Sequence, residues 1–178
     1  MGWIYLLVRH DSDEARVNLL RELMDAHGND VLRVVYGIVR DRQIAEDLSQ
    51  EVFVKVYDHL PEFRQESSYK TWILRIAVNR AKDYLRSAAR RSVPVDDLTY
   101  LTQDETAEQA ALAHLDQQDL WKAVLALPDT YRETMWLYYS QELQVDEIAS
   151  VIGVSVSSVK TRLHRGRELL RRAWGRDD

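Results

Sequence analysis

Apolar residues recur at three- and four-residue spacing through most of this 178-residue chain, and few helix-breaking residues interrupt the pattern. The chain holds only 6 Gly and 3 Pro, and no stretch alternates apolar and polar residues for long enough to form a strand. Such spacing is typical of amphipathic helices, which bury one stripe of side chains against a neighbour. We therefore predict an all-α fold in which helices pack on helices.

Breaks in the apolar spacing set the expected ends of the helices. His27-Gly28 is expected to stop one helix, with Asn29-Asp30 restarting the next, and Pro61 and Pro128 are expected to end two others. The expected helices span about residues 12–27, 29–39, 43–60, 69–84, 106–127, 130–141, 145–152 and 156–174. We find no internal repeat.

The helical spacing fails from about residue 91 to residue 105, where Pro94 and paired aspartates give no sustained apolar face. This segment predicts a flexible linker between two helical domains, each near the small end for an independent domain. We place the domains at 1–90 and 111–178, and the acidic linker at 91–110.

Several classes of function are excluded or disfavoured by composition. The chain has no Cys, so disulfide scaffolds, thiolate metal sites and cysteine catalysis are ruled out. The five His are scattered, and a Gly-rich phosphate loop and a nucleophile elbow are lacking, so we expect no catalytic residue, metal or cofactor. The apolar run at 3–8 is shorter than a membrane span and unlike a secretory signal, which favours a cytoplasmic protein.

The net charge of −5 hides a strong segregation of charge. Basic residues gather at 70–91 and again at 155–178, whereas residues 91–120 hold one basic residue against seven acidic ones. Because attraction to phosphates depends on local basic density, a polyanion is expected to bind at two places. The alternative is that each basic run is simply a solvated helix face.

Residues 145–163 have the form of a helix-turn-helix. Gly153 permits the positive φ of a tight turn, Ser155 can cap the second helix, and small Ala149 permits close helix approach. The outward face of the second helix presents side chains that donate to phosphates and base edges: Ser158, Lys160, Thr161, Arg162, His164 and Arg165. An ordinary helical hairpin with a basic outer face is the alternative.

The helix near 69–86 combines aromatic and basic side chains. Rings on which bases stack, beside cations that meet phosphates, suit a single-stranded nucleic acid. The candidate residues are Phe63, Tyr69, Lys70, Trp72, Arg75, Asn79, Lys82 and Arg86. Tyr69 and Trp72 also lie at core spacing, so packing is an equally open interpretation.

The helix at 43–60 has a different character. Asp47, Gln50 and Glu51 give it an acidic and amidic surface, which is unsuitable for DNA and suitable for a basic protein partner. A charged helix face is also commonly just solvated.

Three segments in order, 45–63, 68–91 and 127–172, resemble the bacterial extracytoplasmic-function sigma factors, two-domain initiation subunits of RNA polymerase. The resemblance implies that Asp47, Gln50 and Glu51 contact the β′ clamp of core polymerase. It places Phe63, Tyr69, Lys70, Trp72 and Asn79 near bases of the −10 promoter element, which this domain opens. It places Arg75, Lys82 and Arg86 near phosphates.

The resemblance also implies that the helix-turn-helix reads the −35 element and that its domain docks on the β flap. Members of the family are commonly held inactive by an anti-sigma factor, often a membrane-anchored one. The apolar run at 3–8 departs from the polar lead-in expected of the family. Two further functions remain as alternatives: a repressor or activator whose N-terminal half senses a ligand or dimerises, and an enzyme.

Overall fold

The structure is a computed structural model that describes the backbone of residues 2–91 and 121–173, with side chains at 13–89 and 121–172. These ranges contain α1 (Gly2–Val39), α2 (Arg42–His59), a 3₁₀ turn η1 (Leu60–Glu62), α3 (Tyr69–Arg91), α5 (Asp129–Ser140), α6 (Val145–Ile152) and α7 (Val156–Ala173). Within the described residues the all-α prediction is confirmed. Nearly all of the predicted linker at 91–110, and the predicted helix at 106–127 up to residue 120, lie outside them.

Helix α1 runs unbroken through His27 and Gly28, so the predicted stop at this point is wrong. A glycine inside a helix costs about 1 kcal/mol relative to alanine. Leu23 before it and Val31 and Val34 after it are buried on one continuing stripe. Burial of each such side chain stabilises by roughly 1.5–3 kcal/mol, which outweighs the glycine.

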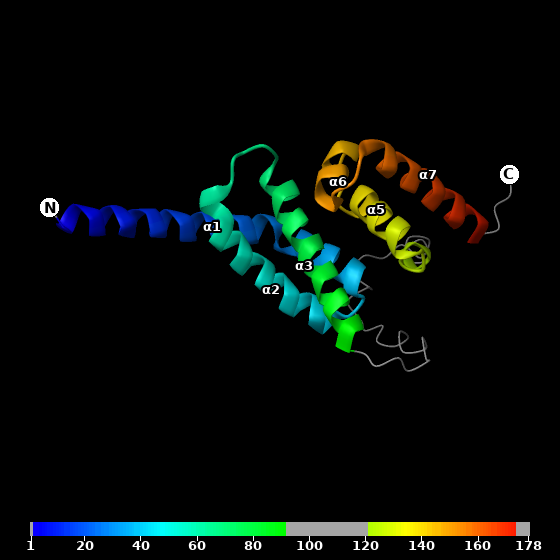
Figure 1. Cartoon of the computed structure of the whole chain (residues 1–178), viewed down its shortest axis with the longest axis horizontal. Helices are drawn as coiled ribbons and strands as arrows, with labels where there is room; N and C mark the ends of the chain where they lie inside the picture. The colour runs from blue at the N-terminus through cyan, green and yellow to red at the C-terminus, as the bar shows by residue number, and fades with distance from the viewer. Residues whose placement is uncertain (1, 92–120, 174–178) are drawn as a thin grey trace.

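Helices α1, α2 and α3 pack on one another as the N-terminal bundle (Figure 1). Asp41 begins α2 by accepting a hydrogen bond from the Ile44 amide at 2.9 Å. Ser68 begins α3 in the same way, with its hydroxyl accepting from the Thr71 amide at 3.1 Å. Such N-caps satisfy amides that the first turn of a helix leaves free. Arg16 of α1 also binds the C-terminal end of α2, because the Arg16 Nε donates to the Tyr57 carbonyl at 2.9 Å.

The C-terminal half holds the predicted helix-turn-helix, formed by α6 and α7. Gly153 has φ 70°, the left-handed conformation expected for this turn, and its amide donates to the Ala149 carbonyl at 3.0 Å. Ser155 caps α7 by accepting from the Ser158 amide at 3.2 Å. The predicted bounds of α6 and the predicted chemistry of the turn are confirmed.

The two halves lie against each other, with α5 beside α1 and α6 beside α3 (Figure 1). These contacts join residues far apart in the chain, such as Gly37 with Trp136 and Lys70 with Gln141. No periodicity in the sequence indicated this packing, because periodicity reports which face of a helix is buried and not what covers it.

Replacing Gly153 with Val is expected to destabilise the helix-turn-helix by about 1–2 kcal/mol, because a β-branched residue resists the left-handed conformation. Thermal unfolding followed by circular dichroism measures the effect. Gly28→Ala is the control, because Gly28 is helical and a Cβ there meets nothing within 4 Å. It is expected to stabilise the chain by up to about 1 kcal/mol. Equal unfolding temperatures for the two variants would contradict the assignment.

Candidate nucleic-acid and polymerase interfaces

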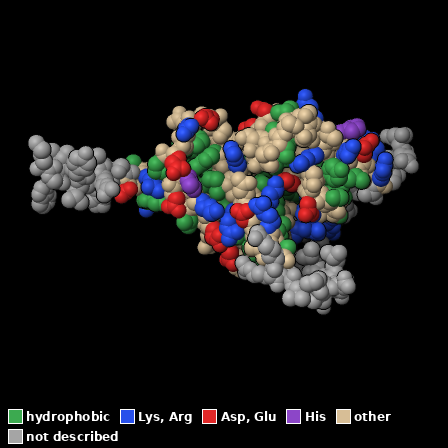
Figure 2. All heavy atoms as spheres, in the orientation of Figure 1, with side chains coloured by type: hydrophobic (Ala, Val, Ile, Leu, Met, Phe, Trp, Pro, Cys, Tyr) green, Lys and Arg blue, Asp and Glu red, His purple; other side chains and the backbone are tan. Residues whose placement is uncertain are grey.

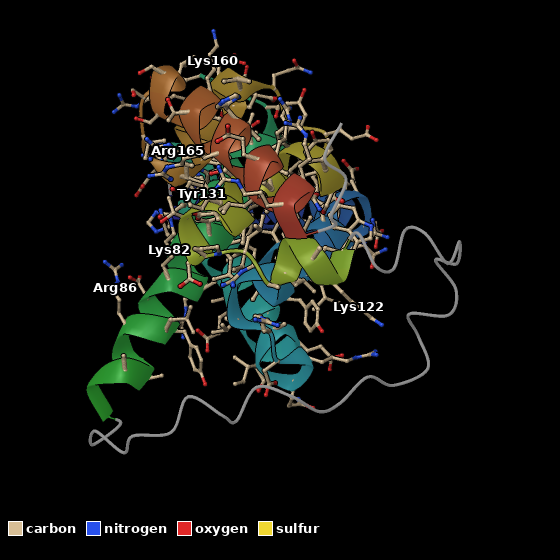
Figure 3. All side chains as sticks on the ribbon, turned by 90° about the vertical axis from the view of Figure 1, so that its right-hand side faces the viewer. Lys82, Arg86, Lys122, Tyr131, Lys160 and Arg165 are labelled. Carbon is tan, nitrogen blue, oxygen red and sulfur yellow. The ribbon has the colours of Figure 1, made fainter. Side chains whose placement is uncertain are left out.

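One face of α3 carries most of the residues predicted to meet the −10 element. Trp72, Arg75, Asn79, Lys82 and Arg86 follow one another at spacings of three and four residues, which places them along a single stripe. Arg75, Asn79 and Arg86 are exposed, whereas Trp72 and Lys82 are half-buried. Figure 3 shows Lys82 and Arg86 on this stretch of α3. The stripe thus offers cations and an amide along the length of the helix.

The aromatic residues gather at the start of the stripe. The Phe63 ring stacks on Tyr69 with centroids 4.5 Å apart, and its centroid lies 4.9 Å from that of Trp72. All three rings are half-buried, and Tyr69 and Trp72 also pack against the core. The two interpretations of these rings are therefore compatible: they anchor the loop before α3 and still present partly exposed ring surface.

Lys70 lies apart from this cluster. It shares the side of α3 that carries buried Leu74 and Ala77, four and seven residues further on. Its Nζ lies 3.4 Å from Asp30 Oδ2 on α1 and donates to the Gln141 carbonyl at 3.0 Å. The structure therefore directs Lys70 toward the C-terminal half and not toward the rings.

The other cations of α3 differ in their partners. Lys82 forms an ion pair with Glu133 of α5, with Nζ and Oε1 2.7 Å apart. Arg86 pairs with Asp83 one turn earlier. Figure 2 shows basic and acidic side chains mixed over the middle of the molecule. The potential of the α3 stripe is thus partly neutralised by carboxylates in this arrangement.

Helix α7 presents the predicted −35 residues on its outer surface. Ser158, Thr161, Arg162 and Arg165 share one stripe, at spacings of three, one and three residues, and Lys160 and His164 flank it. In Figure 3, Lys160 and Arg165 lie on this helix. The buried residues Val159 and Leu163 hold the opposite side against the domain core.

Two of these α7 residues have notable surroundings. His164 Nε2 lies 3.7 Å from Glu168 Oε1 one turn later, which is an ion pair when the ring is protonated. Arg162 is half-buried and lines a groove between the halves together with Lys82 and Glu133. Arg162 thus faces the N-terminal bundle, whereas Lys160, Thr161 and Arg165 are exposed.

The acidic face of α2 is exposed as predicted, and it contains an apolar residue that was not among the predicted contacts. Asp47, Gln50, Glu51 and Val54 share this face at helical spacing. Val54 is 61% exposed, the largest value among the exposed large apolar side chains of the described residues. Glu51 also pairs with Arg80 of α3, with Nε 2.5 Å from Oε2. The signal available in the sequence was a valine that breaks an otherwise polar stripe.

Metal-binding clusters and membrane-spanning helices are both lacking in the part of the chain that the structure describes. No group of three or more His, Cys, Asp or Glu side chains there could hold a metal ion. No helix there combines the length and apolar character needed to cross a membrane.

Comparison with known families and proteins gives a consistent result. The family model for Sigma-70 region 2 matches residues 23–91, and the model for Sigma-70 region 4 matches residues 117–170. The chain is 30% identical to the ECF RNA polymerase sigma factor SigM of Bacillus subtilis, over 87% of this chain and 94% of SigM. It is 30% identical to SigW of the same organism, over 85% of this chain and 86% of SigW.

Solved structures share the fold. The sigma factor RpoE of Bartonella quintana, solved with the anti-sigma factor NepR, has a TM-score of 0.73 and 22% identity, covering 90% of this chain and 99% of RpoE. CnrH, solved with the cytosolic domain of CnrY, has a TM-score of 0.63 and 22% identity, covering 89% of each chain. With the two family models in chain order and SigM matched over nearly its full length, this chain belongs to the extracytoplasmic-function RNA polymerase sigma factors.

Proposed function

We propose that this sigma factor guides core RNA polymerase to promoters by dividing DNA recognition between α7 and α3. The observation that carries the proposal is the single stripe of α3, which joins an aromatic cluster to Arg75, Asn79, Lys82 and Arg86. Stacking rings beside cations can hold unpaired bases and their phosphates, whereas a helix-turn-helix reads paired bases in a major groove. The chain carries both kinds of surface on separate elements.

In this division, α7 enters the major groove of the −35 element. Arg165, Lys160 and Thr161 are exposed and can donate to base edges and phosphates. The Phe63, Tyr69 and Trp72 cluster captures bases of the −10 element as they leave the duplex, and the cations further along α3 follow the backbone. Lys70 can contact the DNA together with these cations only when its contacts with Asp30 and Gln141 are released.

The exposed face of α2 is proposed as the surface that docks on the polymerase clamp. Asp47, Gln50 and Glu51 offer carboxylates and an amide to a basic partner, and Val54 offers apolar area that is removed from water on binding. The region-4 half docks on the β flap. The chain acts as a specificity subunit and supplies no catalytic group.

We further propose that an anti-sigma factor controls this protein. RpoE and CnrH, whose fold it shares, are each described in complex with a protein partner, and the partner of RpoE is named as an anti-sigma factor. Such a partner would cover the α2 face or hold the two halves together, so that core polymerase cannot bind.

The test of the main proposal is run-off transcription with purified sigma-free core polymerase and fragmented DNA from the source organism. Discrete transcripts that require this protein are expected, and their start sites would define both promoter elements. Absence of such transcripts, together with polymerase-independent binding to a symmetric DNA site, would replace the proposal with a conventional repressor or activator.

Arg165→Ala and Asn79→Ala are expected to separate two steps of initiation. Arg165→Ala removes a proposed base contact and should therefore weaken promoter binding about 10-fold or more. The reduction in affinity should be smaller on promoters whose −35 element is scrambled. Asn79→Ala should leave duplex binding nearly unchanged and slow strand opening. Filter binding and permanganate footprinting of the mapped promoters measure the two steps.

Arg171→Ala and Asn18→Ala are matched controls for these variants, because both residues are exposed and lie outside the proposed contacts. Equal losses at both steps from Arg165→Ala and Asn79→Ala would contradict the division of labour.

Val54→Ser is expected to weaken binding to core polymerase about 5- to 10-fold, because it removes apolar area from the proposed clamp contact. The free energy of unfolding should change little, since Val54 is exposed. Fluorescence anisotropy of the labelled chain titrated with core measures the affinity. Met24→Ser, at an exposed apolar residue on α1, is the control, and equal affinities for the two variants would reject this docking surface.

A further inference from the structure

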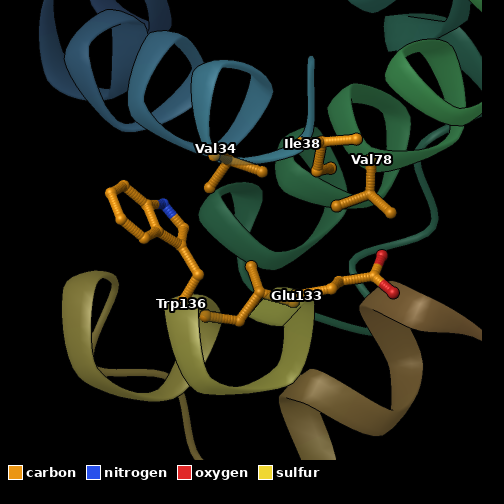
Figure 4. A pocket seen from close by; sticks show the side chains of 7 residues that line it. Val34, Ile38, Val78, Glu133 and Trp136 are labelled. Atoms are coloured by element: carbon orange, nitrogen blue, oxygen red, sulfur yellow. The ribbon is translucent and has the colours of Figure 1, made fainter. Parts of the chain in front are cut away.

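Helix α5 packs on two partners with two different sets of side chains. Trp136 faces the N-terminal bundle, where it lines a small pocket together with Val34 and Ile38 (Figure 4). Met135 instead faces α7 at Gly166, where an added Cβ would come within 2.9 Å of the methionine side chain. Because glycine permits this close approach, the α7 residue that follows it lies against the last turn of α5.

That residue, Arg167, is held by two tyrosines of α5. Its Nε donates to the Tyr139 hydroxyl at 2.8 Å. Its guanidinium carbon lies 5.5 Å from the Tyr138 ring centroid and 5.8 Å from the Tyr139 centroid, both within the range of about 6 Å for cation–π attraction. The two rings meet edge to face, with centroids 4.9 Å apart. These three residues, the Arg167 cluster, orient an arginine that is exposed to solvent.

The Arg167 cluster keeps hydrogen-bond donors for a further partner. Within the residues that the structure describes, Arg167 forms no ion pair, and its bond to Tyr139 leaves both Nη groups unused. The Tyr139 hydroxyl accepts that bond and therefore keeps its own proton to donate, and Tyr139 is 46% exposed. Glu168, next to Arg167 in the chain, lies 3.7 Å from His164 instead. A planar guanidinium with paired free donors suits two oxygens of one phosphate group.

Arg167 also continues one edge of the DNA-reading surface proposed for α7. Lys160, His164 and Arg167 follow one another at spacings of four and three residues, which places them on a single stripe. A helix with its side chains is about 10–12 Å across and the major groove is about 12 Å wide, so the flanks of an inserted helix face the phosphates that border the groove. Since the N-terminal residues of such a helix contact base edges, a cation about three turns further on is placed to meet the backbone.

We propose that the Arg167 cluster binds a backbone phosphate beside the major groove that α7 enters, with Tyr139 as a positioning residue for Arg167. The inference rests on the proposed function of α7. Such a contact carries no base information and fixes the register in which the reading helix sits. Because the Arg167 side chain is held before DNA arrives, it loses less conformational freedom on binding than a free arginine does.

The salt dependence of DNA binding tests the contact, because each neutralised phosphate adds about 0.9 to the slope of log affinity against log salt concentration. The full-length chain is titrated into a fluorescein-labelled duplex of random sequence, about 30 base pairs long, at about 50 to 200 mM KCl, and anisotropy is measured. A random sequence averages the base contacts and requires no known promoter.

Arg167→Ala should weaken binding at the lowest salt about 5-fold or more and make the slope shallower by about 0.9. The affinity difference between this variant and the parent should therefore shrink about 3- to 4-fold as the salt rises from about 50 to 200 mM. Arg171→Ala removes the same charge from an exposed position one turn further on, outside the proposed contacts, and should leave the slope close to the parent's. Lys160→Ala, at a residue already proposed to meet DNA, is the positive reference.

Tyr139→Phe keeps the ring and removes only the hydroxyl that orients Arg167. Binding should weaken about 2- to 3-fold while the slope is nearly retained, because the charge of Arg167 is still present. In a chain that already carries Arg167→Ala, the same change should have no further effect, since a positioning residue acts only through Arg167.

The outcomes separate this inference from the proposed function on which it rests. A shallower slope for Lys160→Ala beside a parental slope for Arg167→Ala would overturn the phosphate contact and leave α7 as the reading helix. Parental slopes for both would overturn the contact together with the DNA role of α7. A parent chain that fails to bind even at the lowest salt would also overturn the contact, because its donors are oriented before DNA arrives. A further loss from Tyr139→Phe in the double variant would reject the positioning role.

Discussion

Helix α3 is the element on which the rest of this protein depends, because α1 and α2 of the N-terminal bundle and α6 of the C-terminal half all pack on it. Ile73, Leu74, Ala77, Val78 and Ala81 are fully buried and fix the helix against its neighbours. The stripe opposite them is left for rings, amide and cations. A 23-residue helix of this kind cannot rotate without exposing its core residues, so the positions of the side chains that are proposed to meet nucleic acid follow from the packing behind them.

Much of the fold could be predicted from the apolar spacing and the turn residues. The bounds of α6, the positive φ of Gly153 and the capping role of Ser155 are local properties, and they are present as expected. The continuity of α1 was missed because glycine is a weak stop signal when apolar residues keep the same face on both sides of it. Local sequence signals such as caps and turn residues predict the short helices well. In a long helix such as α1, the burial of apolar side chains outweighs a local stop signal.

The candidate site was less predictable than the fold, because tertiary contacts decide which of its residues share a surface and which are held by partners elsewhere in the chain. Helical spacing correctly groups Arg75, Asn79 and Arg86, and the same spacing separates Lys70 from them. The partner of Lys82 is Glu133, 51 positions further along the chain, and no pattern in the sequence couples such distant charges. The exposure of Val54 likewise depends on what the fold leaves uncovered.

Glu147 uses its two carboxylate oxygens for two separate tasks. Oε2 accepts from the Gln144 amide at 2.9 Å and completes the capping box of α6, while Oε1 accepts from Thr71 across the contact between the halves. Because each task has its own oxygen, separation of the halves leaves the start of α6 intact. The geometry at the start of the helix-turn-helix is therefore fixed by residues of its own first helix and not by the other half of the chain.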